Sequence, residues 1–209
     1  MKKMIIASTS TVFGSGYLDY LLPVLQVHFK NVNTVTFIPY AMPGGICYDA
    51  YTAIVAQAFS KINMGVKGIH EYKNPKEAIL NAEAIFTGGG NTFELVNQLY
   101  KHDLLNNLKL SIERGIPYVG TSAGSNICGV DMKNTNDMPI VYPPSFKTLG
   151  CFSFNINAHY LDPEKGSTHM GESRETRIKE FHVFNETPVL GLREGSWLSI
   201  ENNKIILQG

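Results

Sequence analysis

The stretch Pro117–Asn126, "PYVGTSAGSN", runs from a short apolar segment into a turn of small residues. Its centre, Gly120–Gly124, fits the pattern G-x-S-x-G, in which a serine occupies a strained turn between a strand and a helix. Small neighbours are needed because that turn is tightly packed, and the strain pushes the serine Oγ out of the sheet end. Ser122 is therefore a candidate nucleophile. The same letters also suit a serine that merely sits in a tight loop.

The segments around this stretch alternate between short apolar runs and longer amphipathic ones. This alternation predicts an α/β fold in three layers, with a mostly parallel sheet covered by helices on both faces. Ligands of such sheets bind outside the carboxyl ends of the strands. Expected strands are residues 2–8, 33–40, 66–72, 84–89 and 116–122, and expected helices are 17–29, 48–62, 75–82 and, as one helix or two, 92–115.

The end of the chain has a different pattern. Three short strand-like runs cover residues 188–194, 196–202 and 204–209, with turn residues at Glu194-Gly195 and Asn202-Asn203. They predict an antiparallel meander or hairpin at the sheet edge. The length of 209 residues suits one domain, 1–209.

Composition excludes several classes of function. Hydrophobic residues make up 44% of the chain, enough for a sizeable core, and Lys+Arg and Asp+Glu both number 18, so no nucleic-acid footprint is present. The three cysteines lie far apart and form no CxxC pair, so neither a zinc site nor a disulfide framework is expected. We also expect no cofactor and no other metal. The apolar run Met4–Ala7 is too short for a signal peptide, and none reaches membrane-spanning length. We expect a cytoplasmic protein without a membrane partner, and leave a homodimer open.

A second glycine-rich turn lies in "FTGGGNTFEL", residues 86–95. It has neither the glycine spacing of a dinucleotide site nor the lysine of a P-loop. It is better suited to donate a backbone N–H to an oxyanion, because glycine lets a ligand approach closely. The alternative is an ordinary strand-to-helix turn, with Asn91 or Thr92 as the N-cap.

A serine nucleophile needs a histidine base and an acid that orients it. One scheme joins Ser122 to His159 and Glu194, each at a strand's end, and position favours it. The other follows the chain order of α/β-hydrolases, with Asp137 or Asp162 as the acid and His169 or His182 as the base. His28 and His102 lie in expected helices, and His70 lies on an expected strand far upstream.

Six segments together resemble a known family. They are "TGGGNT", "GTSAGSN", "NDMPIVYPPSF", "INAHY", "HMGESRETRI" and "LGLREGSWL", in order over nearly the whole chain. The chain is similar to peptidase E, the α-aspartyl dipeptidases of peptidase family S51. The resemblance implies a fold similar to class I glutamine amidotransferases, which use cysteine where this chain has Ser122. It also implies a serine exopeptidase whose substrates are small peptides with N-terminal aspartate, Asp-Xaa.

The resemblance also implies roles for residues. Ser122 matches the nucleophile, His159 the base and Glu194 the acid, and the N–H groups of Gly90 and Ala123 match the oxyanion donors.

Four more residues match positions of functional interest. Asp137 matches a functionally important acid, which could meet the substrate's α-ammonium group or only cap a turn. Arg174 aligns with an arginine for the aspartate side chain, a task that suits a planar guanidinium. Asn91 lies near that pocket, and Ser173 stands where threonine is usual. Arg177, one helical turn after Arg174, is the competing cation, unless it only pairs with a surface acid such as Glu180.

Three other functions remain as alternatives. A cyanophycinase-like peptidase that cleaves β-aspartyl units would share the serine turn and differ in its pocket. A non-catalytic binding protein on the same scaffold would not need the three triad candidates. A glutamine amidotransferase is disfavoured, because Cys128 lies six residues after the nucleophile position.

Overall fold

The computed structural model describes residues 1–163 and 171–209, and its centre is a seven-stranded sheet. β3, β2, β4, β5 and β1 are parallel, whereas β8 is antiparallel to β1 and β9 to β8. The expected mostly parallel sheet with antiparallel C-terminal strands is thus confirmed. In sheet order the strands are β3 (Gly65–Gly68), β2 (Thr34–Ile38), β4 (Ala84–Thr87), β5 (Tyr118–Thr121), β1 (Lys3–Ala7), β8 (Trp197–Glu201) and β9 (Lys204–Gln208).

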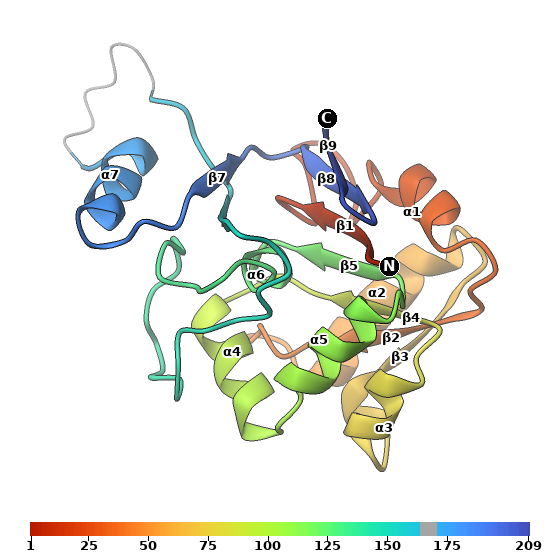
Figure 1. Ribbon diagram of the computed structural model, residues 1–209. Coiled ribbons are helices and arrows are strands. Elements are labelled where there is room, and N and C mark those ends of the chain that lie inside the picture. The colour runs from red at the N-terminus through yellow and green to blue at the C-terminus, as the bar shows by residue number, and fades with distance from the viewer. Residues whose placement is uncertain (164–170) are drawn as a thin grey trace.

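Helices cover both faces of this sheet (Figure 1). Alternate side chains of a strand point to opposite faces, so each strand supplies two cores. Met4 and Ile6 of β1 pack in the core under α3 to α6, whereas Ile5 and Ala7 pack in the core under α1 and α2. The helices are α1 (Leu22–His28) and α2 (Tyr48–Ser60) on one face, and α3 (Pro75–Leu80), α4 (Thr92–Lys101), α5 (Leu105–Glu113) and α6 (Ala123–Asn126) on the other.

A second sheet consists of two strands, β6 and β7. β6 (Asn155–Ala158) and β7 (Val189–Leu192) are parallel, and α7 (Arg174–Phe184) lies between them in the chain. The expected three-stranded meander is therefore wrong in its first strand, because the backbone of β7 pairs with β6. The β8–β9 hairpin with its turn at Asn202-Asn203 is confirmed.

Several boundaries differ from the sequence expectation. The helix expected over 17–29 begins only at Leu22, since Pro23 lacks an N–H and is tolerated in a first turn. The strand expected over 66–72 ends at Gly68, and the chain continues as a 3₁₀ helix over Ile69–Glu71. Residues 92–115 form two helices, α4 and α5, separated where Asp103 takes a φ of 51°. In the described ranges, no helix has the length and apolar character needed to cross a membrane.

Candidate active site

Ser122 stands between β5 and α6 in a strained backbone conformation, with φ 50° and ψ −111°. A non-glycine residue in this region is costly and is found mainly where function requires it. Its small neighbours are needed for packing, because a Cβ on Gly120 would overlap the Gly124 carbonyl and one on Gly124 would overlap the Thr87 carbonyl. The turn has the strand–turn–helix geometry of a nucleophile elbow.

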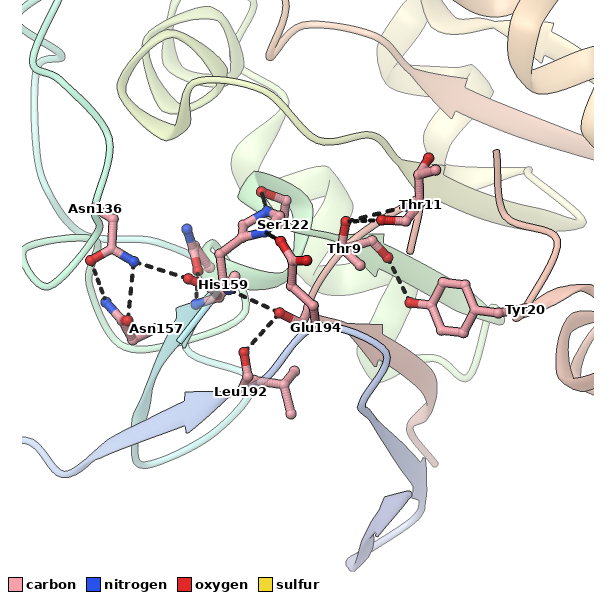
Figure 2. Close-up of polar contacts among 12 residues, drawn as sticks. Thr9, Thr11, Tyr20, Ser122, Asn136, Asn157, His159, Leu192 and Glu194 are labelled. Atoms are coloured by element: carbon pink, nitrogen blue, oxygen red, sulfur yellow. Dashed lines mark hydrogen bonds and ion pairs between the residues drawn. The ribbon is translucent and has the colours of Figure 1, made fainter. Parts of the chain in front are cut away.

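His159 lies between Ser122 and Glu194 (Figure 2). Its Nε2 is 2.9 Å from the Ser122 Oγ, and its Nδ1 is 2.7 Å from the Glu194 Oε1. Ser122 follows β5, His159 follows β6 and Glu194 comes two residues after β7. The carboxyl ends of these strands lie close together, so that Ser122, His159 and Glu194 form a hydrogen-bonded chain of nucleophile, base and acid.

Among the residues that the structure describes, the other scheme for a triad is not assembled. The Asp162 carboxylate pairs with Arg193 at 2.5 and 2.7 Å. His182 lies in the last turn of α7, with Nδ1 3.1 Å from the Asn185 carbonyl. His169 lies outside the described residues.

A buried hydroxyl, that of Ser8, connects the segments that carry the base and the acid. The His159 backbone N–H donates to Ser8 Oγ at 2.9 Å, and Ser8 Oγ donates to the Leu192 carbonyl at 2.7 Å. His159 has a φ of 56°, so its left-handed backbone needs such support. Ser8 was missed in the sequence, where only its place directly after the first strand marks it.

Asparagine side chains hold the edge of β6 that faces away from β7. Asn126 Oδ1 accepts from the Ala158 N–H at 3.2 Å, and Asn136 Nδ2 donates to the Ala158 carbonyl at 3.0 Å. Asn136 also bonds the Asn157 side chain (Figure 2). Asn126 belongs to α6, the helix that directly follows Ser122. The strand that carries the base is therefore bonded to the helix that carries the nucleophile. A run of asparagines was visible in the sequence, but their partners were not.

We expect Ser8→Ala to lower kcat about tenfold, because the His159 N–H would lose its acceptor in a buried place, a loss of about 1–3 kcal/mol. Steady-state kinetics of dipeptide hydrolysis and a thermal melt would measure this. Ser199→Ala is the matched control, since that hydroxyl lies on β8 and, among the described residues, hydrogen-bonds only the Gln208 side chain. An unchanged kcat in Ser8→Ala would contradict the expectation.

Three backbone N–H groups around Ser122 have no acceptor among the described residues: those of Gly89, Gly90 and Ala123, of which the last two are the expected oxyanion donors. Gly90 has a φ of 137°, and a Cβ there would overlap the Ala41 carbonyl, so only glycine fits. A Cβ on Gly89 would come 3.0 Å from the Ser122 Cβ, which shows how closely this loop approaches the serine. The two N–H groups are available to bind an oxyanion.

A cavity of about 470 Å³ opens at the serine. Ser122, His159, Gly89, Gly90 and Asp137 form its polar part. Thr9 and Ser10 add two hydroxyl residues, and the other walls are apolar or aromatic: Tyr17, Met42, Ile46, Tyr51 and Ile54. A larger cavity of about 510 Å³ between α1 and the strands β1, β8 and β9 contains none of the triad residues, so the catalytic geometry selects the smaller one.

The residues expected around an aspartate pocket at α4 bond to the protein itself. Asn91 caps α4, accepting from the Glu94 N–H at 3.1 Å and donating to the Met138 carbonyl at 2.8 Å. Asp137 Oδ2 accepts from the Thr92 N–H at 2.7 Å, a favourable place for an anion. The capping alternatives for Asn91 and Asp137 are therefore present in the structure, while Asp137 also faces the cavity.

Arg174 and Ser173 begin α7. Ser173 is the N-cap, accepting from the Thr176 N–H at 3.1 Å. Burial, then repulsion from Arg177, lowers the pKa of Arg174, and attraction to Asp137 opposes this shift. Arg174 is therefore in electrostatic range of Asp137, although it is not among the described residues that line the cavity. The Arg177 Nε lies 3.8 Å from the Glu172 Oε2, so the surface acid that Arg177 faces is Glu172 and not Glu180.

Among the residues that the structure describes, no three His, Cys, Asp or Glu side chains gather in a way that could hold a metal ion. Cys128 is buried, with its Sγ 3.4 Å from the Gly124 carbonyl.

The chain is similar to known proteins over nearly its whole length. Peptidase E from Streptomyces coelicolor is 45% identical over 206 residues, covering 99% of this chain and 84% of that protein. The "Probable alpha-aspartyl dipeptidase" of Drosophila melanogaster is 45% identical over 211 residues, which cover 100% of this chain and 87% of the Drosophila protein. A solved structure from Listeria monocytogenes EGD-e shares the fold, with a TM-score of 0.76 at 20% identity over 100% of this chain and 98% of that one. The model of peptidase family S51 matches residues 4–208, and the chain belongs to this family.

Proposed function

We propose that this protein is a serine-type α-aspartyl dipeptidase, which hydrolyses dipeptides with an N-terminal L-aspartate. The observation that carries the proposal is the hydrogen-bonded chain Ser122–His159–Glu194 beside two unoccupied N–H donors. The names of the 45% identical relatives support the substrate class.

In the first step, His159 Nε2 takes the Ser122 Oγ proton while Oγ attacks the aspartyl carbonyl. Glu194 accepts the hydrogen bond of the His159 Nδ1–H, which fixes the tautomer and stabilises the imidazolium that forms. The N–H groups of Gly90 and Ala123 bind the oxyanion, a contribution of about 3–4 kcal/mol for each such donor. The imidazolium then protonates the leaving amine, and the C–N bond breaks.

In the second step, a water molecule replaces the leaving amine. His159 takes its proton, the hydroxide attacks the acyl-enzyme, and collapse of the second tetrahedral intermediate returns the proton to Ser122 and releases aspartate. The exposed position of His159, whose side chain is 38% accessible, lets water reach it without a large rearrangement.

Selectivity for aspartate requires a cation for its side chain and an acceptor for its α-ammonium group. Arg174 supplies the cation, because a guanidinium binds a carboxylate through two parallel hydrogen bonds. Asp137, at the polar part of the cavity, supplies negative charge for the ammonium. Asn91 and Ser173 hold the ends of α4 and α7 on which this pocket is built.

A panel of four dipeptides tests the proposal: Asp-Leu, Asn-Leu, Glu-Leu and β-Asp-Leu. We expect kcat/KM for Asp-Leu to exceed the other three by about a hundredfold, because only L-α-aspartate places both its charges and its scissile carbonyl correctly. Faster turnover of β-Asp-Leu would favour a cyanophycinase-like peptidase. No turnover and no labelling by a fluorophosphonate would favour a binding protein. The cytoplasmic location, a homodimer and the lack of nucleic-acid or membrane partners stay predictions.

A further inference from the structure

The Tyr51 side chain of α2 reaches the glycine loop beside Ser122. Its hydroxyl donates to the Gly89 carbonyl at 3.2 Å, in a buried place. The ring stands edge-on to Phe37, with centroids 4.9 Å apart and planes at 89°, so its position is set by packing in the core. The hydroxyl is therefore held at the loop by a rigid side chain on a helix.

The Gly89 carbonyl and the Gly90 N–H belong to the same peptide group. The described chain has no cis peptide bond, and in a trans peptide the C=O and the N–H point in opposite directions. A bond that holds the Gly89 oxygen toward α2 therefore holds the Gly90 hydrogen away from α2. Gly90 is the expected donor to the oxyanion, so the direction of this hydrogen matters for catalysis.

Backbone hydrogen bonds hold the glycine loop at both of its ends. The Gly88 N–H donates to the Ile38 carbonyl at 3.2 Å, and the Asn91 N–H donates to the Ala41 carbonyl at 2.7 Å. The peptide between Gly89 and Gly90 lies between these anchors, and two glycines can rotate it with little steric hindrance. Among the described residues, only Tyr51 bonds its carbonyl oxygen.

A second tyrosine, Tyr17, extends the hydrogen bonding from Tyr51 away from the glycine loop. The Tyr17 hydroxyl lies 3.3 Å from the Tyr51 hydroxyl. Since Tyr51 donates its own proton to Gly89, Tyr17 donates to Tyr51. Burial raises the pKa of both phenols, so both keep their protons at neutral pH.

We propose that Tyr51 is a positioning residue for the oxyanion hole: its hydrogen bond to the Gly89 carbonyl turns the Gly90 N–H toward the tetrahedral intermediate on Ser122. The inference rests on the proposed function for its substrate, but the orientation of the N–H applies to any acyl transfer at Ser122. Tyr17 supports the same hydrogen bond from one step farther away.

Tyr51→Phe tests this, because the ring remains and only the hydroxyl is lost. Deleting an oxyanion donor costs about 10²–10³ in kcat; a donor that is present but free to turn away costs less. We expect kcat for Asp-Leu to fall about 10- to 100-fold with little change in KM. Inactivation by a fluorophosphonate, which carries no peptide leaving group, is expected to slow by a similar factor.

Tyr48→Phe is the matched control. Tyr48 lies on the same helix, one turn earlier, and its ring packs beside Tyr40 and His70, away from the glycine loop. We expect kcat and the fluorophosphonate rate of this variant to equal those of the unmodified protein. Tyr17→Phe should show a smaller loss than Tyr51→Phe.

The possible outcomes are separable. An unchanged kcat in a folded Tyr51→Phe, or a change confined to KM, overturns the inference and makes Tyr51 a wall of the cavity only. If Tyr51→Phe does not fold in a thermal melt, Tyr17→Phe decides, and an unchanged fluorophosphonate rate there overturns it. The unmodified protein could fail to cleave Asp-Leu while a fluorophosphonate still labels it faster than it labels Tyr51→Phe. In that case the proposed substrate fails and the role of Tyr51 stands.

Discussion

Ser122→Ala is expected to lower kcat for Asp-Leu by about 10⁴-fold or more, because the variant lacks the hydroxyl that forms the acyl-enzyme. Ser122 Oγ is the only hydroxyl within 2.9 Å of the His159 Nε2 among the described residues. The fold should survive, since the Ser122 backbone N–H keeps its bond to the Ala7 carbonyl and only the Oγ is lost. A thermal melt would check this.

The matched control is Ser60→Ala, which removes an exposed hydroxyl at the end of α2 whose one hydrogen bond within the described part of the chain is to the Gln57 carbonyl. It should keep kcat and fluorophosphonate labelling, whereas Ser122→Ala should lose both. Turnover retained in Ser122→Ala would exclude the serine mechanism, and the buried Cys128 would then need testing as a nucleophile.

Arg174→Met is expected to lower kcat/KM for Asp-Leu about a hundredfold, since hydrogen bonds to a charged group contribute about 1.5–3 kcal/mol. Methionine keeps much of the length and removes the charge. The preference for Asp-Leu over Asn-Leu should largely disappear, because the neutral amide of asparagine never depended on the cation. The ratio of kcat/KM for these two dipeptides is the decisive measurement.

Arg177→Met is the control for this variant. It removes an equal charge one turn along α7, where Arg177 faces Glu172. We expect its Asp-Leu to Asn-Leu ratio to stay that of the unmodified protein. If Arg177→Met instead loses the preference and Arg174→Met keeps it, the cation of the aspartate pocket has been assigned to the wrong turn of the helix.

The central sheet could be predicted from the sequence because its signals are local. The runs at 2–8, 33–40, 84–89 and 116–122 each contain the strand that the structure shows. The glycines around Ser122 marked the strained turn, since only small residues fit there. Boundaries were harder to predict where a local signal had two interpretations, as at Pro23, which lies in the first turn of α1 instead of interrupting a longer helix.

The pairing of β7 could not be predicted. Its sequence suits a strand next to β8 as well as it suits one next to β6, and the choice depends on which backbone groups are available. The parallel pairing with β6 has a consequence for chemistry, because it brings the ends of both strands together and places His159 beside Glu194, 35 residues away. Glu194 itself lies in the turn that connects β7 to β8.

By itself, the sequence determined which residues could act, because a nucleophile elbow, a glycine loop, a histidine and a glutamate are recognisable from residue type and local spacing. Only the tertiary structure decided how they are held. Ser8 bonds the Leu192 carbonyl across 184 positions, and Tyr51 bonds the Gly89 carbonyl across 38. Serine and tyrosine hydroxyls are common and carry no local pattern, so their roles appear only when folding gives each one its partner.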